Sequence, residues 1–365
     1  MDDEDEGALE PIGGYPHVAV RALLHLNRLG RRIPTRTGIR LFRLRYPTVT
    51  SAGRPTSASA LVAVPRRGRA RGLVSWQHGT ASLRTAAPSA KDAANGLLPA
   101  AVFAGDGYAL VAPDYVGYGV STERHDYYLA DHMATVVRDA IVAAWAALTT
   151  VGVDVDPRLV LAGFSEGAHA SLVTQLRIES EPVPGLTLVG AAPVAAAVDL
   201  AGCGLQGALR GGSRWCSLYL AWLATTYASH YGEPLTDVLT ARWSEQVTDL
   251  FDGTVDGDTT VARLPTDPRD LLDPTFLRTV EAGGPHWFLD RLRENGLLAR
   301  TPTTPVRLFY GGADADVTPD QAAAYVTAHR SGRVEAVCVG DHDHEATLLH
   351  AVVPLRTWIG GLRGA

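Results

Sequence analysis

Cysteine and lysine are scarce in this chain. The three cysteines, Cys203, Cys216 and Cys338, form an odd and sparse set that favours reduced thiols over a disulfide framework, although a bridge between Cys203 and Cys216 stays open. The one lysine, Lys91, stands against 32 arginines and leaves almost no candidate for a Schiff-base mechanism. Covalent chemistry through a lysine is therefore disfavoured.

Long apolar runs and basic blocks are also missing. No apolar run approaches the ~18 residues that a membrane span needs. The first residues are acidic and then contain glycine and proline, unlike a secretory signal, so we expect a cytoplasmic protein. No basic cluster stands out, which argues against a nucleic-acid partner, and the sequence indicates no oligomeric state.

The charge of the chain is concentrated at its start. The formal net charge is −6, and residues 2–6 are all acidic, so the remainder is close to neutral. We interpret residues 1–15 as an acidic, flexible tail.

The rest of the chain has the composition of a globular α/β protein. Of its 365 residues, 46% are apolar and 20% are charged. Short apolar runs alternate with helical patterns, which is typical of a mostly parallel sheet flanked by helices. The predicted strands are 61–64, 73–77, 108–112, 159–164, 186–192, 306–310 and 334–339. The predicted helices are 133–148, 166–178, 319–329 and 345–359.

This alternation stops in the middle of the chain. Residues 200–300 hold four of the seven tryptophans together with proline-rich and glycine-rich loops. The simplest account is a helical cap, or lid, that leaves the sheet after one strand and returns before the next. Residues 1–199 and 301–365 would then form the core domain.

A candidate nucleophile lies where a predicted strand turns into a predicted helix. Gly163-Phe164-Ser165-Glu166-Gly167 matches the G-x-S-x-G pattern, in which a sharp turn exposes the serine Oγ at a helix N-terminus. The loop after strand 73–77, His78-Gly79-Thr80, is placed to complete an oxyanion hole from the backbone amides of Thr80 and Glu166. We interpret His78 as a structural histidine at the strand end.

The candidate acid follows strand 306–310. Asp314 lies in the turn Gly311-Gly312-Ala313-Asp314-Ala315-Asp316-Val317, where it would point inward. Asp316 lies nearer a helix N-cap and is the main competitor. Asp199, after the preceding strand, is an outside alternative.

The candidate base follows the last strand. Both His342 and His344 lie in the right loop, and His344 directly precedes an apolar helix, the usual place of a triad histidine. The run Asp341-His342-Asp343-His344 could instead hold a divalent ion. Because strand order already explains a histidine here, we predict no metal and no cofactor.

These motifs resemble those of the secretory lipase family, typified by yeast lipase A, within the α/β-hydrolases. The resemblance rests on four features: G-F-S-E-G-A-H-A around Ser165, D-Y-V-G-Y-G at 114–119, G-G-A-D-x-D-V at Asp314, and the spacing from His344 through Pro354 to Trp358. It covers most of residues 40–365. It implies an α/β-hydrolase fold with a helical cap after the sixth strand, and an esterase or lipase activity.

We therefore expect a serine carboxylic-ester hydrolase that works through an acyl-Ser165 intermediate, with Asp314 and His344 completing the triad. The lack of a secretion signal and of the family's cysteines favours a small or medium apolar ester over bulk lipid. Candidate substrate contacts are Tyr115, Trp215, Tyr219, Trp222 and Trp287, with packing of the cap core as the alternative.

Two other functions compete with ester hydrolysis. The same site could eliminate acetate or transfer an acyl group in an intracellular biosynthetic pathway, since one fold supports unrelated chemistries. The chain could also be a binding protein on a hydrolase scaffold, which an intact triad argues against.

Overall fold

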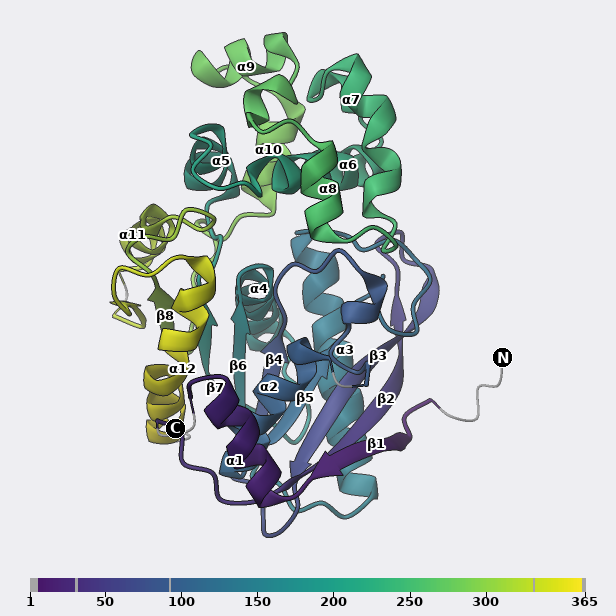
Figure 1. The fold of residues 1–365 in the computed structure, drawn as a ribbon, viewed down its shortest axis with the longest axis vertical. Coiled ribbons are helices and arrows are strands. Elements are labelled where there is room, and N and C mark those ends of the chain that lie inside the picture. Colours follow the sequence, from purple (N-terminus) through teal and green to yellow (C-terminus); the bar gives the residue numbers. More distant parts are fainter. Residues whose placement is uncertain (1–5, 30–31, 92, 331, 363–365) are drawn as a thin grey trace.

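A nine-stranded sheet organises the chain. The computed structural model describes residues 6–29, 32–91, 93–330 and 332–362. Its strands are β1 (Leu9–Tyr15), β2 (Ile39–Val49), β3 (Pro55–Pro65), β4 (Leu73–Gln77), β5 (Ala109–Pro113), β6 (Arg158–Phe164), β7 (Thr187–Val194), β8 (Val306–Tyr310) and β9 (Val334–Cys338). They lie side by side in the order β1-β2-β3-β5-β4-β6-β7-β8-β9 (Figure 1).

The sheet has an antiparallel part and a parallel part. Strands β1, β2, β3 and β5 pair antiparallel, whereas β5, β4, β6, β7, β8 and β9 pair parallel. The central strands β4 and β5 are buried along their whole length, as expected when helices cover both faces. All parallel strands end at the same edge, so the loops that follow them gather there.

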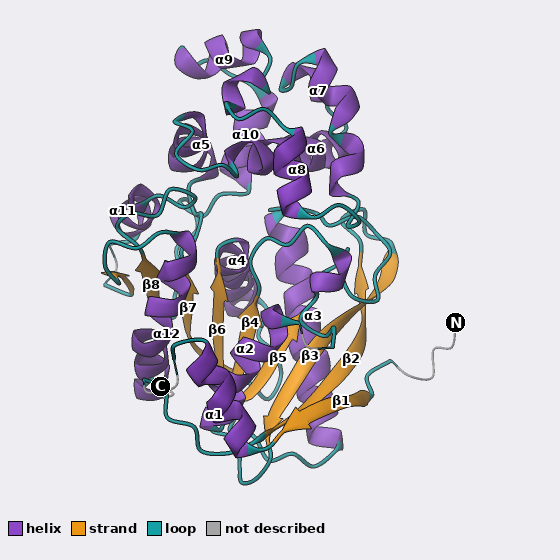
Figure 2. Cartoon of the chain, in the orientation of Figure 1, coloured by secondary structure: helices purple, strands orange, loops and turns teal. Residues whose placement is uncertain are grey.

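Helices cover both faces of the sheet (Figure 2). One face packs against α1 (His17–Leu26), α2 (Ala94–Phe103) and α12 (His344–Gly361). The other packs against α3 (Ala130–Thr150), α4 (Glu166–Ser180) and α11 (Pro319–Ala328). Alternate residues of one strand enter the two cores: Leu61 and Ala63 of β3 face the first group, and Val62 and Val64 face the second.

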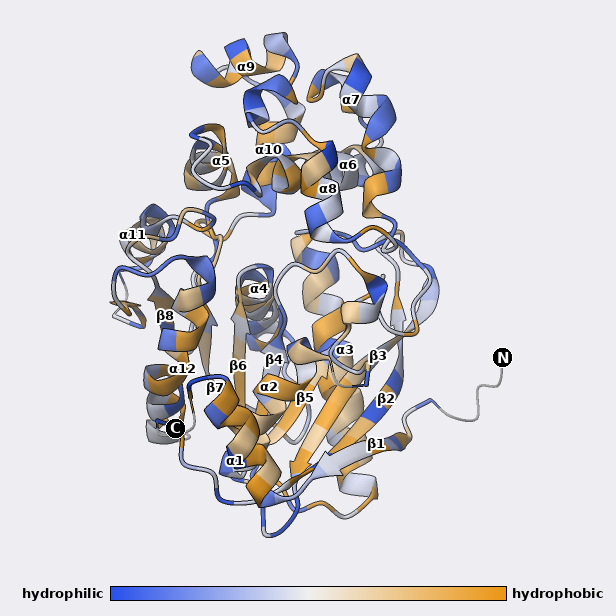
Figure 3. Cartoon of the chain, viewed as in Figure 1, coloured by the Kyte–Doolittle hydropathy of each residue, from blue (hydrophilic) through white to orange (hydrophobic). Residues whose placement is uncertain are grey.

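Between β7 and β8 the described chain is helical. After the single turn Leu200–Gly204 it forms α5 (Leu205–Leu209), α6 (Cys216–Tyr231), α7 (Ala241–Gln246), α8 (Gly257–Arg263), α9 (Pro274–Glu281) and α10 (Trp287–Glu294), joined by short 3-10 turns. These helices gather above the end of the sheet (Figure 1). Their apolar residues, Trp222 and Phe288 among them, join the same core as α2 and α12. Figure 3 shows that hydrophilic residues cover much of the outer helices α7 and α9.

The N-terminal prediction needs correction. Residues 1–5 of the expected tail lie outside the described residues, but residues 9–15 form β1, which pairs with β2 at the edge of the sheet. Backbone pairing with Leu41 and Leu44 holds this segment despite its two glycines. Two strands that the sequence analysis does not predict, β1 and β2, precede the others, and the helical segment follows the seventh strand of the chain, not the sixth. All three cysteines are free, so Cys203 and Cys216 do not pair.

Helix α3 is, among the described residues, the one helix long and apolar enough to cross a membrane. Half of its most apolar stretch is buried within the protein, where Met133 and Val137 contribute to the core. A buried core helix passes the same length and hydropathy test, so this feature is weak evidence for a span.

The residue that follows β5, Asp114, joins three parts of the core. Its carboxylate accepts hydrogen bonds from the Ser59 hydroxyl at 2.5 Å and from the Ser89 hydroxyl and amide at 2.5 and 2.8 Å. Burial raises the pKa of Asp114, and the hydrogen bonds from the two serines oppose that rise. This network fixes the chain at the start of residues 114–119, beside the site described below.

We predict that Asp114→Ala lowers the free energy of unfolding by about 3 kcal/mol, because it removes charge-assisted hydrogen bonds and leaves two buried hydroxyls without their acceptor. Asp131→Ala is the matched control. Its carboxylate is 76% exposed and pairs with Arg300 at the surface, so its loss should cost less than about 1 kcal/mol. Urea denaturation measures both variants, and equal small losses would contradict the structural role of Asp114.

Candidate active site

Ser165 occupies a strained turn between β6 and α4. Its backbone has φ 57° and ψ −120°, a left-handed conformation that is rare for a residue other than glycine. Its amide donates to the Val194 carbonyl at 2.9 Å, which ties the turn to the end of β7. Ser165 is buried, with 7% of its surface exposed. The turn therefore holds the serine at the end of the sheet, at the first turn of α4.

The two glycines of the motif allow the chain to pack closely around this serine. A Cβ on Gly167 would lie 2.1 Å from the Gln77 carbonyl oxygen and 2.4 Å from that of His78. A Cβ on Gly163 would lie 2.3 Å from the Gly167 carbonyl oxygen. Neither position has room for a side chain. The end of β4 packs so closely against the start of α4 that both glycines of the G-x-S-x-G pattern are required.

The two amides predicted to form the oxyanion hole lie at this contact. Glu166 is the first residue of α4, where an amide has no acceptor within its own helix. Gly79, which precedes Thr80, lies so close to the turn that its Cβ would be 3.5 Å from the Ser165 Cβ. The Thr80 hydroxyl is 3.0 Å from the Tyr127 hydroxyl, which links the loop after β4 to the loop between β5 and α3. The arrangement is compatible with two amides directed at one developing oxyanion.

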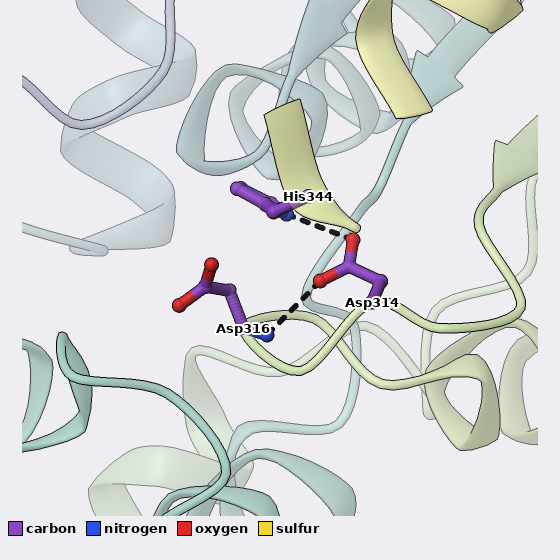
Figure 4. A group of neighbouring side chains, drawn as sticks. All are labelled: Asp314, Asp316 and His344. Atoms are coloured by element: carbon purple, nitrogen blue, oxygen red, sulfur yellow. Dashed lines mark hydrogen bonds and ion pairs between the residues drawn. The ribbon is translucent and has the colours of Figure 1, made fainter. Parts of the chain in front are cut away.

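Asp314 and His344 meet at the same end of the sheet. One carboxylate oxygen of Asp314, Oδ2, lies 2.8 Å from Nδ1 of His344. Its other oxygen accepts from the amides of Asp316 and Val317 at 3.0 and 2.9 Å, as Figure 4 shows for Asp316. Burial would lower the pKa of His344, but the hydrogen bond and charge of Asp314 raise it above its ordinary value. The His344 ring also contacts the Phe164 ring, with centroids 4.6 Å apart.

The competing residues have other partners. Asp199 caps the turn that opens the helical segment by accepting from the amides of Gly202 and Cys203. Asp316 accepts from the Ser213 hydroxyl. The ring of His342 stacks on His350, with centroids 3.7 Å apart. None of these contacts is with His344 Nδ1, which bonds to Asp314.

The run considered for metal binding does not converge on one point. The Asp343 carboxylate caps α12 through the Ala346 amide at 2.9 Å, and His342 stacks on His350. A different group, Asp314, Asp316 and His344, brings its potential ligand atoms within 4.8 Å of one another (Figure 4). Hydrogen bonds within the protein already account for both oxygens of Asp314 and for Nδ1 of His344.

A small cavity opens beside Ser165. Its volume is about 70 Å³, and it lies between the turn and the helical segment. Its walls are mainly apolar, with tyrosine hydroxyls and one carboxylate; they include Tyr127, Tyr128, Tyr219, Leu205, Leu223 and Asp316. Of the five predicted substrate contacts, Tyr219 lines this cavity.

The other four predicted contacts do not line this cavity, and each packs against neighbouring side chains. Tyr115 is buried, stacks on His78 and donates its hydroxyl to the His78 carbonyl at 3.1 Å. Trp222 stacks between Tyr127 and Phe251. Trp215 lies under the Arg214 guanidinium, and Trp287 packs edge-on against Phe288. Aromatic composition alone does not distinguish the core of the helical segment from the walls of the site.

Sequence reasoning missed a buried ion pair next to the nucleophile. Nε2 of His125 lies 2.5 Å from the carboxylate of Glu166, which is fully buried. Burial would lower the pKa of His125, but the charge of Glu166 raises it above its ordinary value. This contact holds the side chain of a predicted oxyanion-hole residue in place. No local pattern signals it, because 41 residues separate the partners.

The pairing of Asp314 with His344 yields a pH-dependent prediction. The raised pKa of His344 means that this pair stabilises the fold fully below pH 6.5, the ordinary pKa, and that the contribution is lost as pH rises through the folded-state pKa. Asp314→Asn should therefore cost about 2 kcal/mol of stability at pH 6 and less at pH 9. In NMR titration the His344 pKa should fall in the variant.

Asp316→Asn is the matched control, because it removes a carboxylate from the same loop without breaking the hydrogen bond to Nδ1. It should move the His344 pKa less than Asp314→Asn does. A larger shift from Asp316→Asn would contradict the assignment of Asp314 as the partner.

Comparison with known proteins places this geometry in context. The model of the secretory lipase family matches residues 97–212, the segment that contains Ser165. A search of curated protein sequences gave no significant match.

Solved structures resemble the chain over nearly its whole length. A Legionella pneumophila protein assigned as a hydrolase is 24% identical, with a TM-score of 0.87 and 96% of this chain and 97% of that one covered. The rice cell wall degrading esterase LipA from Xanthomonas oryzae is 24% identical, with a TM-score of 0.86 and 98% of each chain covered. Candida antarctica lipase A is 16% identical, with a TM-score of 0.65 and 93% of this chain and 78% of that one covered.

At these identities the structural likeness establishes the fold, and the family match supports, at family level, a hydrolase of the esterase and lipase type. The chain has the α/β-hydrolase fold and resembles the secretory lipases in the segment that carries its candidate nucleophile.

Proposed function

We propose that this protein is a serine hydrolase that cleaves small to medium apolar carboxylic esters through an acyl-Ser165 intermediate. The observation that carries the proposal is the hydrogen bond between Asp314 and His344 Nδ1 at the end of the sheet where Ser165 occupies its strained turn. A buried carboxylate bonded to Nδ1 holds the imidazole with Nε2 free to accept a proton. The resemblance to the secretory lipases supports the same chemistry.

In the proposed reaction His344 moves a proton twice. Its Nε2 accepts the proton of the Ser165 hydroxyl as Oγ attacks the ester carbonyl, and the resulting imidazolium is stabilised by Asp314. The imidazolium then gives the proton to the leaving alkoxide, which departs as an alcohol and leaves the acyl-serine. A water molecule, deprotonated by His344, releases the carboxylic acid and restores Ser165.

The amides of Thr80 and Glu166 would stabilise the oxyanion of each tetrahedral intermediate. Losing one such donor typically costs about 3 kcal/mol of transition-state stabilisation. The buried Glu166 carboxylate would oppose a negative charge nearby, and its partner His125, whose pKa that carboxylate raises despite burial, would offset this effect when protonated. The ion pair therefore makes an acidic residue compatible with an oxyanion hole.

The apolar character of the cavity beside Ser165 supports an uncharged substrate. Leucine side chains and three tyrosine rings form most of its wall. An apolar acyl or alkyl group gains free energy on leaving water for such a surface, whereas a charged group would lose its hydration without a partner.

We predict that Ser165→Ala lowers the hydrolysis of p-nitrophenyl esters by on the order of 10³-fold or more, because the covalent route is removed and transition-state binding alone remains. The measurement is kcat/KM for esters from acetyl to palmitoyl, with the optimum at short or medium chains. Ser180→Ala, at the exposed end of the same helix, is the control and should keep full activity.

Two results would contradict the proposal. One is full activity of Ser165→Ala on every ester. The other is the release of an alkene with a free carboxylate, in place of an alcohol, from an alkyl ester, since that product indicates elimination.

A further inference from the structure

A second and larger cavity lies beside the nucleophile turn, where Gly79 and Phe164 line it. Its volume is about 500 Å³, within the range of roughly 300–1,000 Å³ typical of ligand sites. It is bounded by α2, by the first half of α12 and by the carboxyl ends of β4 and β6. It belongs to the core of the fold, whereas the small cavity lies against the helices that follow β7.

Three of the predicted site residues, Thr80, Ser165 and His344, have a chain neighbour on the wall of this large cavity. Gly79 precedes Thr80, Phe164 precedes Ser165, and Asp343 and Glu345 flank His344. The ring of Phe164, which lines the cavity, contacts the His344 ring at a centroid distance of 4.6 Å. Ser165 itself lines the small cavity, while the residue before it, Phe164, lines the large one.

The chemistry of the wall indicates what the large cavity can hold. Its surface is formed mainly by apolar side chains: Leu98, Val102, Phe103, Leu348, Leu349 and Val352. No arginine or lysine of the described chain is among the residues that line it, and two acidic residues stand beside His344. A carboxylate, sulfate or phosphate would find no positive partner there, so the wall fits an uncharged hydrocarbon group.

The two volumes differ enough to orient a substrate. By the same measure the small cavity offers about 70 Å³ and the large one about 500 Å³, so the large cavity has more room for a long chain. We infer that the large cavity between α2 and α12 binds the bulky apolar substituent of the ester. This inference rests on the proposed function. It adds that the cavity between α2 and α12 determines the selectivity for the chain length of the ester. Filling the cavity should then remove selectivity for a long chain.

Two isomeric esters distinguish the acyl chain from the alkyl chain of the alcohol. Ethyl hexanoate carries the long chain on the acyl side and hexyl acetate carries it on the alcohol side, with ethyl acetate as the short reference. Leu98→Trp and Leu349→Trp fill the cavity from opposite walls, so the test survives if one variant fails to fold. Leu26→Trp, at an 80% exposed position on α1, is the control.

The readout is kcat/KM for each long ester divided by that for ethyl acetate. Each buried methylene is worth roughly a fourfold factor, so both filled variants should lower the ratio at least tenfold for one of the two isomers. The isomer affected identifies which side of the ester enters the cavity. Leu26→Trp should leave the ratio unchanged.

Leu223→Trp fills the small cavity and tests the alternative that the bulky substituent binds there. If it abolishes the chain-length ratio while Leu98→Trp and Leu349→Trp keep it, the bulky substituent binds against the helical segment and the inference is wrong.

Binding in the Ser165→Ala background separates this inference from the proposed function. Without turnover, the dissociation constants of both isomers are measured by calorimetry, and that of the tighter-binding isomer should rise at least tenfold in both filled variants. This result supports the cavity even if wild-type protein hydrolyses no ester. Equal dissociation constants in filled and unfilled proteins overturn it even if esters are hydrolysed.

Discussion

The close approach of β4 to the start of α4 is the contact on which the site depends. Gln77 and His78 pass so near Gly167 that a single Cβ would be 2.1 Å from a carbonyl oxygen. That approach brings the loop with Gly79 and Thr80 against the turn and leaves Ser165 with φ 57°. A strained residue persists only where its surroundings overdetermine it. Here a pair of glycines, an amide bonded to Val194 and the buried Glu166 hold the turn.

Parallel strand order brings the remaining groups to the same place. The loops after β4, β6, β8 and the end of β9 lie at one edge of the sheet, so Gly79 and Asp343, which are 264 positions apart in the chain, line one cavity. Asp314 is fixed by two backbone amides before it meets His344, which pre-orients the carboxylate. The arrangement leaves two cavities beside the nucleophile turn.

Continuous apolar runs made part of the fold predictable. Strands β4 and β8 have the predicted bounds, since each is a short apolar run between turn signals. Strand β2 escaped prediction because Arg40, Arg43 and Arg45 interrupt its apolar residues, as an antiparallel strand with an exposed face allows. Helix α2 contains Gly96 and Pro99, which hide its helical pattern. The pairing of His125 with Glu166 and the large cavity arise from tertiary contacts and leave no local signal.

The most direct test of the central claim is covalent labelling of the nucleophile. Wild-type protein is treated with an alkyl fluorophosphonate, and intact mass and peptide mapping identify the site. The account predicts one adduct per chain on Ser165, its absence in Ser165→Ala, and labelling slowed by on the order of 10²-fold or more in His344→Ala, because the hydroxyl then lacks its base. An unlabelled wild-type protein, or an adduct on another residue, would contradict the assignment of Ser165 as an activated nucleophile.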